Sequence, residues 1–114
     1  MKKDEVYLRH IYDAVRDIAD FTSGVSVEDF LENKEKQYAV LKALEVIGEA
    51  AKNVSPAFRA KNPEIPLKEA AAMRDKLIHD YMGVKLEIVW HTVKIELPKL
   101  KKSIAAALKE KKRS

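Results

Sequence analysis

A chain of 114 residues has room for one domain with a substantial core, but not for two. The absence of cysteine excludes disulfides and thiolate zinc sites, and no apolar run approaches the length of a membrane-spanning helix. The net charge of +4, from 22 basic and 18 acidic residues, is compatible with a polyanionic partner. We therefore expect a single domain over residues 1–114, located in the cytoplasm and without a membrane contact.

The N-terminal part of the chain has the apolar periodicity of helices. The first helix is expected over about residues 4–22 and should end before Gly24, which permits the left-handed conformation of a helix stop. His10 lies off the apolar stripe of this helix, so we interpret it as a surface residue. A short helix should follow and carry Phe30 and Leu31 into the core.

A longer helix is expected over about residues 34–53. Its small residues Gly48 and Ala50-Ala51 would allow another helix to come close. Glu49 stands beside them and has two interpretations. It is an exposed surface acid, or it steadies Arg74 from the neighbouring helix.

Residues 55–66 contain three of the four prolines and are expected to form a connecting loop. Pro66 can open the next helix, because its missing N–H is not needed in the first turn. That helix should run to about His79, with Leu77 and Ile78 as core anchors that hold the functional residues in place.

The last helix is expected over about residues 85–109, with a kink near Lys94 to Pro98 instead of a stop. Glu87 and His91, four residues apart, could share a metal ion, but no third ligand accompanies them, and we predict no metal site. Residues 109–114 form a basic tail, interpreted as a frayed, solubilising helix end or as an element that steers RNA.

The chemically richest segment runs over residues 73–82 and contains Arg74, Asp75, His79 and Tyr81. The Arg fork matches a phosphate, and His transfers protons near neutral pH. If Arg74 held a phosphodiester while His79 took the proton of a neighbouring 2′-hydroxyl, RNA would be cleaved by internal transesterification without a metal. Tyr81 could orient the phosphate through its hydroxyl.

Helical spacing places Arg74 and His79, the two main catalytic candidates, on different faces of their helix. At about 100° per residue, Asp75 and His79 share one face and Arg74 and Tyr81 share another, whereas Arg74 and His79 diverge by roughly 140°. These two side chains converge only if the helix loosens near His79 or if a second copy of the chain completes the site. We therefore expect a cleft at an isologous dimer interface.

The pattern Arg74, four residues, His79, one residue, Tyr81 resembles the signature of the HepT-like toxins, within the HEPN group of ribonucleases. The similarity extends along most of the chain, through Val46-Ile47-Gly48-Glu49-Ala50-Ala51, Ile65-Pro66, Val89-Trp90 and Leu97-Pro98. The position after the signature Arg is often Asn in this family and is Asp75 here.

The helical patterns, together with this resemblance, predict an all-α fold: an antiparallel up-and-down bundle of four main helices plus a short extra helix, forming a homodimer through the face that bears the signature. The resemblance implies the toxin of a toxin–antitoxin system that acts as a metal-independent RNA endonuclease. Arg74 and His79 would be catalytic, Asp75, Tyr81 and Glu49 would support them, and no cofactor or DNA partner is expected.

The resemblance also implies a partner, a minimal nucleotidyltransferase (MNT) antitoxin encoded beside the toxin. This antitoxin would neutralise the chain by transferring AMP from ATP to Tyr81, which adds bulk and negative charge to the cleft. Two alternatives stay open. The chain is a non-catalytic subunit that presents nucleotide or substrate to a nucleotidyltransferase through Arg74, or it is a helical interaction module.

Overall fold

A computed structural model describes residues 2–79, 83 and 85–113, and the side chains of these residues except 2 and 111–113. The elements are α1 (Lys2–Thr22), α2 (Val27–Glu32), α3 (Lys34–Asn53), α4 (Pro56–Lys61), α5 (Leu67–His79), α6 (Leu86–His91), the π-helical segment η2 (Thr92–Glu96) and α7 (Leu97–Arg113). These described residues contain helices and no strand, which confirms the all-α prediction. None of their helices is both long enough and apolar enough to cross a membrane.

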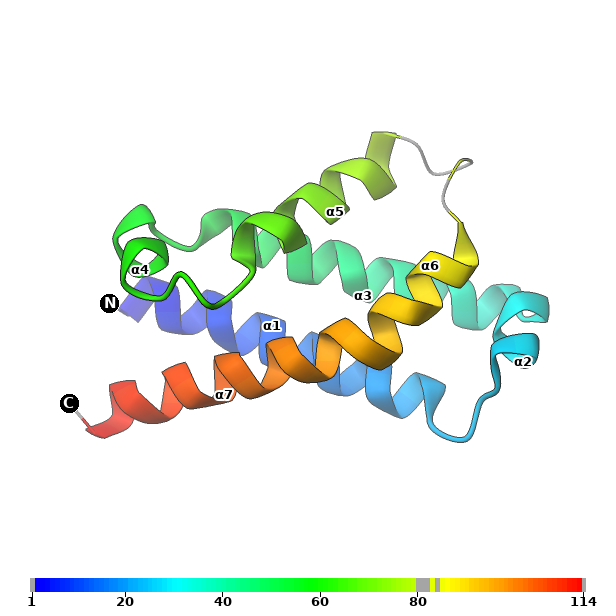
Figure 1. The fold of residues 1–114 in the computed structure, drawn as a ribbon, viewed down its shortest axis with the longest axis horizontal. Helices are drawn as coiled ribbons and strands as arrows, with labels where there is room; N and C mark the ends of the chain where they lie inside the picture. Colours follow the sequence, from blue (N-terminus) through cyan, green and yellow to red (C-terminus); the bar gives the residue numbers. More distant parts are fainter. Residues whose placement is uncertain (1, 80–82, 84, 114) are drawn as a thin grey trace.

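The long elements form an antiparallel up-and-down bundle. Figure 1 shows α1, α3, α5 and the combined run of α6, η2 and α7 alternating in direction, so that both termini lie at the same end. The short α2 and α4 lie at opposite ends of the bundle (Figure 1). The molecule measures 46 × 30 × 19 Å, and four main helices with a short α2 are present as predicted.

Apolar stripes from every long helix meet in one core, as their helical spacing requires. Its largest fully buried side chains include Phe30, Leu8, Ile11, Ile18, Leu67 and Ile104. Two predicted core residues are instead exposed: Leu31 by 36% and Ile78 by 46%. Each follows a buried neighbour in the same helix, and a step of about 100° turns it away from the core.

The predicted loop over residues 55–66 contains a helix, α4 (Pro56–Lys61), which is a correction to the sequence analysis. Pro56 opens this helix, and the Ser55 hydroxyl caps it by accepting the Phe58 N–H at 3.2 Å. Ser55 also donates its N–H and its hydroxyl to the Asp4 carboxylate at 2.8 and 2.7 Å. Pro56, which the sequence analysis placed in a loop, therefore starts a helix that is tied to the beginning of α1 through Ser55 and Asp4.

The predicted long last helix is interrupted by η2, which ends at Glu96, two residues before Pro98. The proline has no N–H to donate to the carbonyl four residues earlier, at Lys94. The Leu97 N–H donates instead to the carbonyl of Thr92, five residues back. Figure 1 shows α6 and α7 running in different directions on either side of this segment, which agrees with the predicted kink.

Helices α3 and α5 come very close together at Gly48. A Cβ at this position would lie 2.0 Å from the Arg74 Cβ and 2.9 Å from the Ala70 carbonyl oxygen. Only a residue without a side chain fits, which confirms that small residues of α3 admit a neighbouring helix. The same contact sets the base of the Arg74 side chain directly on α3.

Candidate functional site

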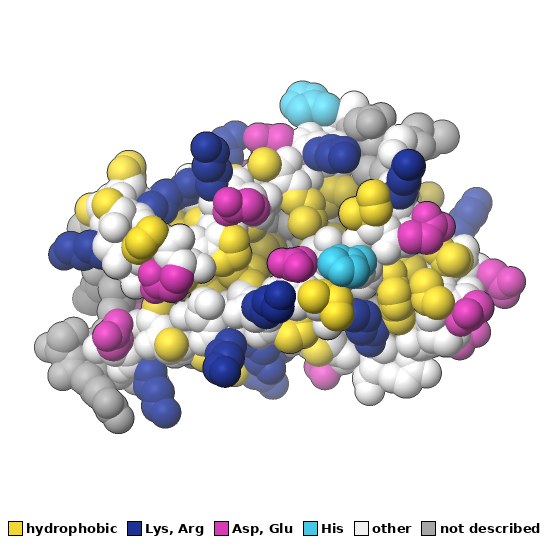
Figure 2. All heavy atoms as spheres, viewed as in Figure 1, with side chains coloured by type: hydrophobic (Ala, Val, Ile, Leu, Met, Phe, Trp, Pro, Cys, Tyr) yellow, Lys and Arg dark blue, Asp and Glu magenta, His cyan; other side chains and the backbone are white. Residues whose placement is uncertain are grey.

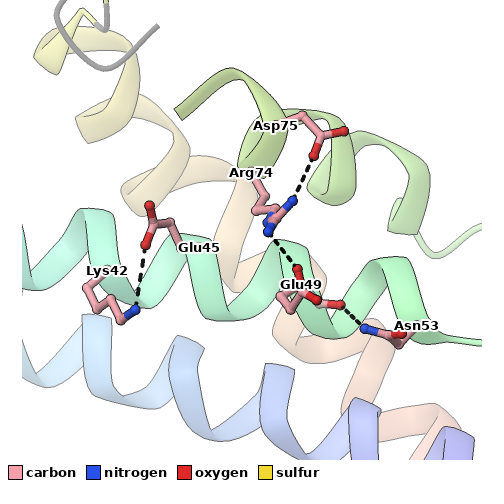
Figure 3. A network of polar contacts seen from close by, with 6 residues as sticks. All are labelled: Lys42, Glu45, Glu49, Asn53, Arg74 and Asp75. Carbon is pink, nitrogen blue, oxygen red and sulfur yellow. Dashed lines mark hydrogen bonds and ion pairs between the residues drawn. The ribbon is translucent and has the colours of Figure 1, made fainter. Parts of the chain in front are cut away.

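Arg74 lies in the second half of α5 and extends over α3 (Figure 3). Its Nη2 forms an ion pair with Glu49 Oε2 at 2.9 Å, and its Nη1 forms one with Asp75 Oδ1 at 3.1 Å. The Arg74 side chain is 25% exposed. The guanidinium is therefore fixed at the protein surface by one carboxylate from each of two packed helices.

The two carboxylates orient the guanidinium without removing it from solvent. The side chains of Glu49 and Asp75 are 54% and 48% exposed, so each ion pair contributes at most about 1 kcal/mol to stability. A guanidinium has five N–H donors, and these two contacts use only part of that set. Arg74 can therefore bind a phosphate oxygen while it stays paired, or exchange a carboxylate for the phosphate.

His79 is the last residue of α5 and is exposed. The helix is unbroken between Arg74 and His79, so the two side chains project roughly 140° apart within one chain. The structure therefore shows no loosening that would bring them together. Tyr81, the third signature residue, lies outside the described residues.

A groove of about 290 Å³ opens between α1, α3 and α5. Its lining includes Arg74 and Glu49 on one side, and Tyr7 and His10 of α1 on the other. His10 is exposed, as predicted, but the sequence did not place it near Arg74. That placement depends on how α1 packs beside α3, which the spacing within one helix cannot reveal.

A second ion pair lies further along the same face of α3, between Lys42 Nζ and Glu45 Oε2 at 3.7 Å (Figure 3). Both residues line the groove. Figure 2 shows basic and acidic side chains interspersed over the face that it presents. Across the residues that the structure describes, no group of three or more His, Cys, Asp or Glu side chains could hold a metal ion.

The comparisons with known proteins agree on one family. Residues 11–107 match the family described as "Ribonuclease HepT-like". A "Probable ribonuclease HepT" of Thermococcus cleftensis is 50% identical over 95 residues, which cover 83% of this chain and 86% of that protein. A putative RNase of Methanocaldococcus jannaschii is 46% identical over 110 residues, covering 96% and 91% of the two chains.

A putative RNase of Caldanaerobacter subterraneus subsp. tengcongensis is 41% identical over 112 residues, which cover 98% of this chain and all of that protein. No solved structure gives a significant match.

Proposed function

The chain belongs to the HepT-like family and is a ribonuclease, and we propose that it cleaves RNA internally without a metal ion, using Arg74 and His79. The observation that carries this proposal is the Arg74 guanidinium, held at a surface groove by Glu49 and Asp75 on the helix that ends at exposed His79. A fixed cation and an imidazole that can accept or donate a proton are the two parts that such a reaction needs.

The reaction is an internal transesterification. A base removes the proton of a 2′-hydroxyl, the 2′-oxygen bonds to the adjacent phosphorus, and the bond to the 5′-oxygen breaks. An acid protonates the leaving 5′-oxygen, so the products carry a 2′,3′-cyclic phosphate and a 5′-hydroxyl. Arg74 stabilises the charge that develops on the phosphoryl oxygens, and His79 supplies the base or the acid.

The active site is completed by a second copy of the chain. Because Arg74 and His79 diverge within one helix, Arg74 of one subunit acts with the histidine of its partner. The exposure of Ile78 supports this arrangement. Ile78 lies between Arg74 and His79 along α5, and its aliphatic side chain is 46% exposed. A homodimer through this face would bury Ile78 and leave a cleft for RNA.

The ribonuclease acts as the toxin of a toxin–antitoxin pair in the cytoplasm. A minimal nucleotidyltransferase antitoxin transfers AMP from ATP to Tyr81, two residues after His79. The added phosphate and nucleoside block the cleft and repel RNA. Mass spectrometry after co-expression with the adjacent gene tests this part: an AMP adduct is expected on the wild-type chain and absent from Tyr81→Phe.

Cleavage by the purified protein tests the main proposal. In EDTA, the wild type should cut single-stranded RNA to fragments ending in 2′,3′-cyclic phosphate, and Arg74→Ala and His79→Ala should each abolish this cleavage. Lys76→Ala and His91→Ala are matched controls, because both replace exposed residues outside the groove lining, and they should cut at the wild-type rate.

Two outcomes would contradict the proposal. RNA that stays intact in EDTA but is cut when a divalent ion is added would refute the metal-free mechanism. A wild type that never cuts RNA, yet binds nucleotide or a nucleotidyltransferase through Arg74, would identify the chain as a non-catalytic subunit.

A further inference from the structure

The groove beside Arg74 contains aromatic side chains that the proposed reaction does not use. Tyr7 and His10 project from α1 with their ring centroids 6.3 Å apart and their planes 84° from parallel. Tyr7 is half-buried and packs against the core, whereas His10 is exposed. The α1 side of the groove therefore presents a partly buried phenol ring and an accessible imidazole.

The same groove contains two cations, both contributed by other helices. Lys42 comes from α3 and Arg74 from α5, and each is paired with a glutamate of α3, at 3.7 Å to Glu45 and 2.9 Å to Glu49. Figure 3 shows the two pairs along one face of α3. These pairs are partly exposed, so exchanging a carboxylate for a phosphate costs little free energy.

We propose that this groove is a binding subsite for one unpaired nucleotide of the RNA, beside the phosphate that is cleaved. The inference rests on the proposed function, because Arg74 is shared between the two sites. Arg74 and Lys42 bind the backbone phosphates, and the base lies against the rings of Tyr7 and His10. His10 thereby becomes a substrate-binding residue of the enzyme.

Size and chemistry both favour a single unpaired nucleotide. A groove of about 290 Å³ is at the lower end of the range of small-ligand sites, which suits one nucleotide and not a duplex. Cations that follow a backbone, next to aromatic rings that stack on bases, are the usual combination in proteins that bind single strands. A base inside a duplex is already stacked and paired, and cannot reach an aromatic side wall.

The test is the binding of a short, fluorescein-labelled single-stranded RNA, and of the same strand annealed to its complement, to full-length protein that carries His79→Ala. Adding His10→Gln should weaken single-strand binding by about fivefold or more, as expected for a lost base contact, and leave duplex binding unchanged. Lys42→Gln should weaken single-strand binding to a similar degree.

Matched controls separate the groove from general effects of charge and of histidine loss. His91→Gln removes another exposed histidine, and Lys52→Gln removes another exposed lysine of α3, both outside the groove lining. Both controls should bind RNA as tightly as the His79→Ala parent. Light scattering on every variant should give the same mass, because none of the substitutions changes Ile78, the groove residue through which the proposed dimer forms.

Three results would overturn the inference. The first is that the groove variants and the control variants bind RNA with equal affinity. The second is that His10→Gln loses as much affinity for the duplex as for the single strand. The third is a loss of self-association in His10→Gln or Lys42→Gln. Failure of the proposed function is recognised separately, in the wild type alone, by the absence of RNA cleavage.

Discussion

At the scale of single residues, Arg74 is surrounded by more negative charge than it carries. Glu49 and Asp75 together place two carboxylates on one guanidinium, and in the proposed reaction the RNA phosphate must approach the same cation. Their partial exposure limits the repulsion, because water screens charges at the surface. The acids therefore set the direction of the guanidinium at some cost in affinity for a phosphate.

Asp75→Asn separates these two effects. The amide oxygen can still accept a hydrogen bond from Arg74, while one negative charge next to the phosphate is removed. We expect the KM for RNA to fall by between about two- and tenfold with little change in kcat. Steady-state cleavage of a labelled RNA measures both constants, and an unchanged or higher KM would show that Asp75 does not oppose the substrate.

Among the structural elements, the contact between α3 and α5 controls the site. Gly48 allows α5 to lie directly on α3, and this contact brings the Arg74 side chain to Glu49. A methyl group at Gly48 would overlap the Arg74 Cβ, which belongs to the rigid start of that side chain. The helices must then separate, so a small change in packing moves Arg74, the residue proposed to act on the phosphate.

Gly48→Ala should therefore impair both stability and cleavage. Alanine gains about 1 kcal/mol of helix propensity, but overpacking costs about 1–3 kcal/mol, and the severe overlap places the net loss at about 1–2 kcal/mol. Chemical denaturation measures the free energy of unfolding, and the rate of RNA cleavage measures the effect on the proposed active site.

Ala72→Gly is the control, since it lowers the stability of α5 by about 1 kcal/mol at an exposed position of that helix. The control should keep its cleavage activity. A Gly48→Ala protein that cuts RNA at the wild-type rate would show that the position of α5 on α3 is not critical.

The sequence predicted those elements that depend on local periodicity. The bounds of α3 agree with the expected 34–53, and the π-helical interruption falls where Pro98 predicted a kink. Helix α4 was missed, because three prolines in twelve residues indicate a loop unless Pro56 is interpreted as a first helical residue.

The candidate site was predicted in part, because local patterns indicate residues along one helix but not how the helices pack together. Arg74 and His79 stand out by residue type and spacing along one helix, and Glu49 was one of two interpretations for α3. The position of His10 in the groove depends on the packing of α1 beside α3, and no pattern within either helix encodes that register.

At the scale of the whole molecule, the proposed site requires two chains. Ile78 lies on the same face of α5 as Arg74, one turn away, and is 46% exposed. In the proposed dimer, the partner subunit would cover this aliphatic side chain. The monomer described by the structure would then hold the parts of the active site without completing it.

Ile78→Asp should prevent formation of the proposed dimer and lower RNA cleavage at least about tenfold, because a buried charge without a partner opposes association. Ile95→Asp is the matched control, since Ile95 is 44% exposed and lies outside the groove lining. Light scattering and cleavage should both be unchanged in the control. An active monomeric Ile78→Asp protein would refute the shared site.

The most direct measurement mixes two inactive proteins. Arg74→Ala and His79→Ala are unfolded together, refolded together and assayed for RNA cleavage. A mixed dimer contains one site with an intact arginine from one chain and an intact histidine from the other, so about a quarter of the wild-type activity should return. If mixed dimers form and the RNA stays intact, Arg74 and His79 do not act across two subunits, and the central claim is wrong.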